Sequence, residues 1–205
     1  MTRHVPLLCL LLLSCTKSSP PAPAPAQAPA PAQTPQAQAK AESAPAPARP
    51  AEGPRCSAST LSAEPNAPKA PLPPAVESMR RRISAAAVAC DYEALARLAS
   101  EKGKEFSLGF GTDTDVAATW RKSEQDGVPV LAQLVKLLNL PHTQDEKVYI
   151  WPSAYSANDT PEDWKALEAL YPAERLTEWR EGEGYAGFRT GIDESGDWQF
   201  ALRGD

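Results

Sequence analysis

The sequence predicts a small α+β domain, in which several short helices pack on a mainly antiparallel sheet that ends in a C-terminal β-hairpin. Apolar residues recur every three or four positions in several segments between residues 74 and 171, with short strand-like runs among them. Two further runs of strand length flank a turn at residues 193–197. All 14 aromatic residues lie between Tyr92 and Phe200, so this part of the chain is expected to hold the core.

Residues 1–14 have the three-part form of an export signal. Arg3 precedes the apolar run 7–13, and the small residue Ser14 precedes Cys15. The run is far shorter than the roughly 20 apolar residues that a membrane-spanning helix needs. We therefore expect residues 1–14 to be removed on export.

The segment Leu12-Leu13-Ser14-Cys15 resembles the lipobox of bacterial lipoproteins. The resemblance implies cleavage between Ser14 and Cys15, diacylglycerol on the Cys15 sulfur and an acyl chain such as palmitate on its amine. Thr16 replaces the aspartate of the retention signal, which by the same resemblance favours the outer membrane, facing the periplasm. Two or three acyl chains would hold the protein firmly at the cell envelope. The alternative is a chance cysteine in a leucine-rich signal.

Residues 15–75 are predicted to form a disordered, lipidated linker. Between Thr16 and Ala75 lie 16 of the 22 prolines and no aromatic residue, valine, isoleucine or methionine. Such a segment buries too little apolar surface to offset its chain entropy. The globular domain is accordingly expected over residues 76–205.

Charge differs between these two segments. Residues 16–75 carry a net charge of +2, whereas residues 76–205 contain 15 basic and 23 acidic residues, a net charge of −8. A domain this acidic is a poor partner for nucleic acid or an anionic membrane surface.

Cys56 and Cys90 are the remaining cysteines of the mature chain. An oxidising compartment would allow a disulfide between them, but their spacing does not require one. A buried, apolar Cys90 is the alternative.

Five helices are predicted along the domain. The first begins at Pro74 and carries Arg80-Arg81-Arg82 on a solvated face, and the second is capped by Asp91 and ends at Gly103. Asp113 or Thr114 caps the third, and Pro129 opens a fourth, almost wholly apolar helix that we expect at the centre of the core. Thr160-Pro161-Glu162-Asp163 starts the fifth.

The strands are predicted from alternation and from short apolar runs. Residues 105–111 alternate between apolar and other residues, and residues 148–151 form a run that Pro152 ends. Residues 185–192 and 198–202 form the closing hairpin, with Gly196 in its turn.

Two stretches resemble an uncharacterised domain of exported bacterial proteins. One is the stretch from Tyr149 to Tyr155, with its Ile150-Trp151-Pro152-Ser153, and the other is the hairpin with Gly187-Phe188-Arg189, Gly191-Ile192 and Gly196-Asp197-Trp198. The resemblance covers about two-thirds of the domain and implies no activity.

Residues for catalysis or metal binding are sparse. His142 is the single histidine after residue 14, so a Ser-His-Asp mechanism would depend on it alone, and no His/Cys zinc motif occurs. Asp113 and Asp115 are better explained as helix caps than as metal ligands. A carboxylate pair among Asp159, Glu162, Asp163 and Glu181 could serve a glycosidase, but an acid-rich domain produces such pairs by chance. We predict no metal and no cofactor apart from the lipid on Cys15.

The candidate binding face combines aromatic side chains with one arginine: Trp151, Tyr155, Tyr185, Arg189 and Trp198. Core packing is the alternative for Trp151 and Trp198, whereas Tyr155, Tyr185 and Arg189 are expected at the surface. Such a face could hold a glycan, a peptide or a partner strand.

The leading hypothesis is a non-enzymatic envelope lipoprotein that binds a protein or a cell-wall component. One alternative is an envelope hydrolase that uses carboxylates or His142. Another is a small-ligand sensor or inhibitor domain with a pocket beside the hairpin.

Overall fold

The computed structural model describes residues 55–103, 105–109 and 115–204, and it confirms the predicted fold class. The helices are α1 (Pro74–Val88), α2 (Tyr92–Ser100), α3 (Val116–Gln125), α4 (Val130–Leu137), α5 (Pro161–Ala166) and α6 (Ala173–Glu181), with short 3-10 helices η1 (Ser153–Tyr155) and η2 (Leu167–Ala169). The strands are β1 (Thr143–Asp145), β2 (Val148–Trp151), β3 (Arg189–Asp193) and β4 (Trp198–Leu202).

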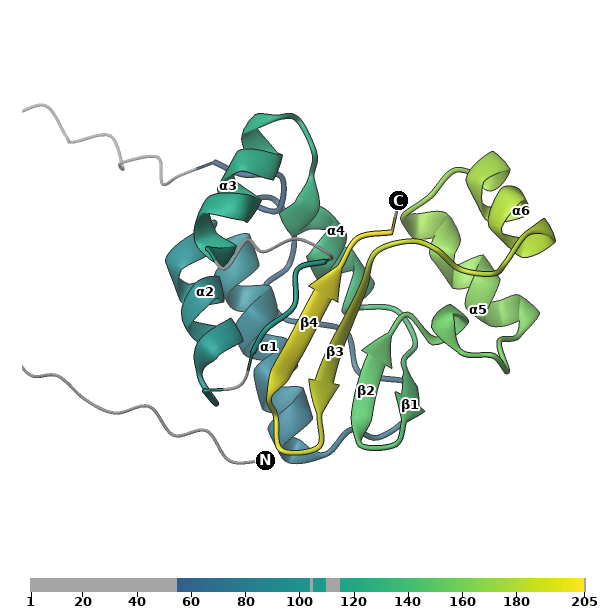
Figure 1. The fold of residues 1–205 in the computed structure, drawn as a ribbon, viewed down its shortest axis with the longest axis horizontal. Coiled ribbons are helices and arrows are strands. Elements are labelled where there is room, and N and C mark those ends of the chain that lie inside the picture. The colour runs from purple at the N-terminus through teal and green to yellow at the C-terminus, as the bar shows by residue number, and fades with distance from the viewer. Residues whose placement is uncertain (1–54, 104, 110–114, 205) are drawn as a thin grey trace, which may run out of the picture. The chain divides into compact units, whose positions relative to one another are not determined.

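The four strands form one antiparallel sheet in the order β1-β2-β3-β4. The strands β3 and β4 are the predicted hairpin, with Gly196 at a φ of 81° in its turn. Helix α1 contacts β3 and helix α2 contacts β4, whereas α5 and α6 lie to the side of the sheet (Figure 1). The helical layer α1–α4 therefore packs on one face of the sheet.

Helix α4 is at the centre of the core, as predicted. Its residues Val130, Leu131, Leu134 and Leu137 are all 0% exposed, because an almost wholly apolar helix is stable only when it is surrounded. The sheet contributes Trp151, Ile192 and Trp198 to the same cluster. A second cluster joins Trp164, Leu167 and Leu176 of the α5–α6 region to Ala154 and Tyr185.

Two predicted helix caps are present, and helix α3 is capped by Asp115, one of the two acids interpreted as helix caps. The Asp91 carboxylate accepts a hydrogen bond from the Ala94 amide, and Thr160 forms a capping box with Asp163. The other predicted caps of this helix, Asp113 and Thr114, lie outside the described residues.

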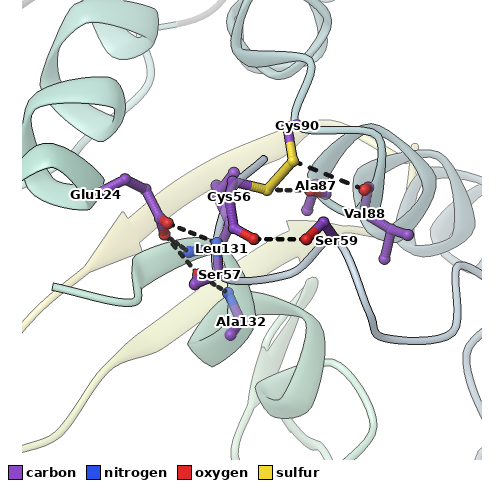
Figure 2. Close-up of a disulfide and its surroundings, with 9 residues drawn as sticks. All are labelled: Cys56, Ser57, Ser59, Ala87, Val88, Cys90, Glu124, Leu131 and Ala132. Atoms are coloured by element: carbon purple, nitrogen blue, oxygen red, sulfur yellow. Dashed lines mark hydrogen bonds between the residues drawn. A yellow bond between two sulfur atoms is a disulfide. The ribbon is translucent and has the colours of Figure 1, made fainter. Parts of the chain in front are cut away.

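Residues 55–73 pack on the domain, so the linker predicted for residues 15–75 extends too far toward the C-terminus. We call residues 55–73 the N-terminal strap. Ala58 is fully buried in the core, Leu61 and Leu72 pack against it, and Cys56 forms a disulfide with Cys90 at the end of α1 (Figure 2). The composition of this segment did not indicate its fold, because the disulfide and a few apolar side chains hold it on a core built by the rest of the chain.

The strap also caps helix α4. Pro129 at the helix start offers no side-chain acceptor, which leaves the first amides of α4 without a local partner. Ser57 Oγ accepts a hydrogen bond from the Ala132 amide at 2.9 Å, and Glu124 accepts one from the Leu131 amide at 2.9 Å (Figure 2). Ser57 in turn donates from its hydroxyl and its amide to Glu124, at 2.6 and 2.8 Å.

Arg80 is buried, contrary to the solvated face predicted for the arginine triplet. It is 1% exposed, pairs with Glu77 at 2.8 Å, and donates hydrogen bonds to the carbonyls of Leu138 and Asn66, each at 2.7 Å. Its guanidinium therefore joins α1, the end of α4 and the strap. Arg81 and Arg82 are exposed, as predicted.

The strand predicted at residues 105–111 is reduced to one bridge. The backbone of Ser107 pairs with β4 through the amide of Ala201 and the carbonyl of Gln199, and Phe110 and Gly111 lie outside the described residues. Strand β1 and helix α6 were not predicted, because few of their residues are buried.

Candidate functional site

The five residues predicted for a binding face do not form one surface. Trp151 and Trp198 are each 1% exposed and belong to the core. Core packing was the alternative interpretation of these two residues. The indole Nε1 of Trp198 donates to Thr190 Oγ1 at 2.7 Å, which satisfies its one polar group. Neither tryptophan is available to a partner.

Tyr185 is buried as well, although it was expected at the surface. Its hydroxyl donates to the Phe188 carbonyl at 2.6 Å and lies 3.2 Å from the hydroxyl of Tyr171. Burial, together with the neighbouring Tyr171, raises its pKa far above the ordinary tyrosine value. Tyr185 therefore holds the chain that enters β3.

Tyr155 and Arg189 do come together at the surface. Tyr155 is 42% exposed, and the guanidinium carbon of Arg189 lies 5.1 Å from the centre of its ring, a cation–π distance. Tyr155 comes from η1 and Arg189 from the first position of β3, so the sheet sets their spacing. Within the described residues, Arg189 has no carboxylate partner.

Arg189 lies on the sheet face that turns away from the helices. Alternation along each strand and the pairing register place one set of residues on this face, which we call the open sheet face: Thr143, Asp145, Val148, Ile150, Arg189, Gly191, Asp193, Phe200 and Leu202. Its apolar members belong to neither hydrophobic cluster of the described residues. In Figure 1 no helix lies in front of β3 and β4.

Gly191 shapes the middle of this face. A Cβ at Gly191 would lie 2.4 Å from the ring of Phe200 and 3.0 Å from Val148, so the glycine lets the ring lie against the backbone of β3. Phe200, Leu202 and Val148 remain half-buried. The result is a shallow apolar surface bordered by Arg189 and Tyr155.

A depression of 300 Å³ adjoins the open sheet face at Tyr155. It is lined by residues of β1 and β2 and by the loop after η1: Thr143, Gln144, Asp145, Ile150, Tyr155, Ser156, Ala157 and Asn158. Its walls offer hydroxyl, amide and backbone groups beside the Ile150 side chain, which suits contact with a polypeptide.

A larger depression of 640 Å³ lies beside the disulfide, between the strap and α3. The charged groups there have partners within the protein: Arg121 pairs with Glu93 at 3.0 Å, and Glu124 accepts the hydrogen bonds that cap α4. We regard this region as structural, because its polar groups serve the fold.

The described residues place His142 away from the partners a hydrolase would need. Its ring packs 5.7 Å from that of Tyr149 and 5.4 Å from that of Trp151. Burial lowers its pKa, and the nearby charge of Arg80 lowers it further. No hydrogen bond joins His142 to a serine or a carboxylate in the part of the chain described.

The candidate catalytic carboxylates are not gathered into a site either. Asp163 accepts hydrogen bonds from Ser153 and Thr160. Burial by itself would raise the pKa of Asp163. These hydrogen bonds have the larger combined effect, so its pKa is lowered. Asp159, Glu162 and Glu181 are exposed. Among the described residues, no group of three or more His, Cys, Asp or Glu side chains could hold a metal ion.

Ser14 and Cys15, the predicted cleavage and lipid-attachment residues, lie outside the described residues. None of the helices described in the structure combines the length and apolar character needed to cross a membrane. Comparisons with protein-family models, with curated proteins and with solved structures found no match for this chain.

Proposed function

We propose that this chain is an exported lipoprotein whose α+β domain is a non-enzymatic binding module. The signal 1–14 is removed, Cys15 carries diacylglycerol and an N-acyl chain, and the lipids anchor the protein in the cell envelope, on the periplasmic side of the outer membrane. The partner is an envelope protein or a cell-wall component. The lipobox-like Leu12-Leu13-Ser14-Cys15 supports the anchor.

The open sheet face supports binding. A sheet in a small domain normally covers its apolar residues, yet Val148, Phe200 and Leu202 remain half-buried outside both described clusters. Arg189 lies at the border of this surface with an aromatic ring beneath it and no carboxylate beside it in the described residues. A surface that combines apolar area with an unpaired arginine suits recognition.

The hydrolase alternative has weaker support. Ser-His-Asp chemistry requires the histidine to contact a nucleophile, whereas His142 packs against Tyr149 and Trp151. A glycosidase needs two carboxylates at a shared cleft, but Asp163 is already engaged by Ser153 and Thr160.

Intact-mass measurement tests the anchor. We expect the purified native protein to begin at Cys15 and to carry the mass of two or three acyl chains, and we expect Cys15→Ser to leave the membrane fraction. An unmodified amino terminus, or membrane association of Cys15→Ser equal to that of the native chain, would refute the anchor.

A photo-crosslinking amino acid at Leu202 tests the binding module in intact envelopes. We expect it to give a discrete adduct that Arg189→Gln reduces, whereas the same probe at Lys122, on the exposed side of α3, gives none. Equal crosslinking from both positions, or no effect of Arg189→Gln, would contradict the proposal.

A further inference from the structure

We propose that the open sheet face binds a short extended peptide segment and that Arg189 receives an acidic side chain of that segment. This proposal rests on the binding function proposed above and names its partner class. Three features of the face support it: the charges of Arg189 and Asp145, the area of the face, and its shallow shape around Arg189.

The first observation concerns the guanidinium of Arg189. Several other surface arginines of this acidic domain pair with carboxylates: Arg81 with Glu64 at 2.7 Å, Arg121 with Glu93 at 3.0 Å and Arg175 with Glu178 at 3.2 Å. Within the described residues, Arg180, which lies over the Trp164 ring, and Arg203 have no ion pair, but neither lies on the open sheet face. Arg189 has no such pair in the described residues, although the segment 76–205 supplies 23 acidic residues. A guanidinium can bind a carboxylate through two parallel hydrogen bonds, so an acid from a partner is the natural complement.

Tyr155 prepares Arg189 for this role. The ring lies 5.1 Å from the guanidinium carbon and restricts a side chain that otherwise has several rotamers. A guanidinium that contacts a ring through its face can still donate through the N–H groups at its edges. Less side-chain entropy is then lost when a carboxylate binds.

The size of the face indicates a short segment. With four strands about 4.8 Å apart and about 13 Å of strand length, the open sheet face covers on the order of 200 Å². A stable interface between folded proteins buries about 800 Å² on each partner, so this face alone is too small for a second copy of the chain. A peptide of about five residues has the matching length.

Asp145 gives the bound segment a direction. It pairs with Val148 in the sheet register, lies on the same face as Arg189 at the opposite end, is exposed, and forms no ion pair within the described residues. The segment should therefore place its acid over Arg189, apolar side chains over the half-buried Val148 and Phe200, and a neutral or basic side chain near Asp145.

The shallow surface around Arg189 favours an acidic side chain of the peptide, rather than its terminal carboxylate, as the group that binds there. Capture of a chain terminus requires a closed end with several backbone amides directed at the carboxylate. The residues around Arg189 instead form a shallow surface that a chain can cross, with the depression of 300 Å³ continuing beyond Tyr155.

Fluorescence anisotropy with the purified full chain tests this proposal. The probe is a labelled library of acetylated, amidated pentapeptides with Glu first, an equal mixture of Leu, Val and Phe third, Lys fifth and Thr between. We expect saturable binding that weakens about tenfold or more when Gln replaces the Glu or when Arg189→Gln is used, because a charge-assisted hydrogen-bonded pair is lost. Arg189→Lys should retain part of the affinity, and Tyr155→Ala should weaken binding without removing the charge.

Arg175→Gln is the matched control, because Arg175 is exposed and already paired with Glu178. Its affinity should equal that of the native chain, and equal thermal midpoints should show that the Arg189 variants fold. Equal affinity for the Glu and Gln libraries, unchanged affinity in Arg189→Gln, or no binding at all would overturn the peptide proposal. Crosslinking at Leu202 that depends on Arg189 would, in those cases, leave the binding function intact with a partner of another class.

Discussion

Single residues of the domain show where sequence patterns stop being informative. Val76, Met79 and Ile83 recur at helical spacing on one side of α1, as the period of an amphipathic helix requires, and all three are buried. The same pattern assigned Arg80 to solvent, because a helical period cannot reveal that two distant carbonyls, of Leu138 and Asn66, need a donor at that position. Tyr185 was misassigned for the same reason, since its partner Tyr171 comes from another element.

Arg80→Met should destabilise the protein by about 3 kcal/mol, since it removes a buried ion pair and leaves two carbonyls without a donor. Arg81→Met is the matched control: Arg81 also pairs with Glu77, but its side chain is 55% exposed, so a much smaller loss of stability is expected. Urea unfolding of both variants measures the difference. Equal losses would show that Arg80 does not hold the strap and α4 together.

His142 should make the domain less stable as the pH falls below 6.5. Its pKa is lowered in the folded state by burial and by Arg80, so below the ordinary value of 6.5 the unfolded chain binds the proton more readily. Stability is then lost between pH 6.5 and the lower folded pKa. Urea midpoints at pH 8.0 and 5.5 should differ for the native chain, and the difference should shrink in His142→Gln.

At the scale of helices and strands, strong local sequence patterns were sufficient to predict most of the fold. Helix α4, the capping box of α5, strand β2 and the closing hairpin each have a dense apolar pattern or a specific turn sequence, and each was predicted. Strand β1 was missed because Thr143–Asp145 is polar and gains its structure from pairing with β2. Helix α6 was missed because only one of its residues, Leu176, is buried.

The cap of α4 also depends on distant partners. Ser57→Ala should cost about 1 kcal/mol, because the Ala132 amide loses its acceptor and Glu124 loses a donor. Ser59→Ala, two residues along the strap, removes only an exposed hydrogen bond to Cys56 and should change stability by less than about 0.5 kcal/mol. Thermal unfolding that ranks Ser59→Ala equal to or worse than Ser57→Ala would contradict this role.

The disulfide is the main covalent constraint on the strap. Cys56 and Cys90 are 34 residues apart, for which chain-entropy estimates give a stabilisation of about 3–4 kcal/mol. The double variant Cys56→Ala/Cys90→Ala should lose about this much, and reducing agent should lower the stability of the native chain but not that of the variant. A native chain indifferent to reducing agent would refute the constraint.

At the scale of the whole molecule, the candidate site was predicted in part. The pairing of Tyr155 with Arg189 could be foreseen, because a hairpin beside strand 148–151 brings the two segments together. Which sheet face the helices cover could not be read from the sequence, since Trp151 and Ile150 are both apolar and lie on opposite faces. The extent of the domain was underestimated, because the strap depends on a core formed by residues far along the chain.

The central claim is that the open sheet face is left uncovered by the helices of the described residues and is occupied by a partner in the envelope. Hydroxyl-radical footprinting of the full chain, purified and in intact envelopes, tests it directly. In the purified protein, Tyr155 and Phe200 should be oxidised while Trp151 and Trp198, each 1% exposed, stay protected; in envelopes, Tyr155 and Phe200 should become protected as well. Protection of Phe200 in the purified chain, or the same oxidation of Tyr155 and Phe200 in both samples, would contradict the account.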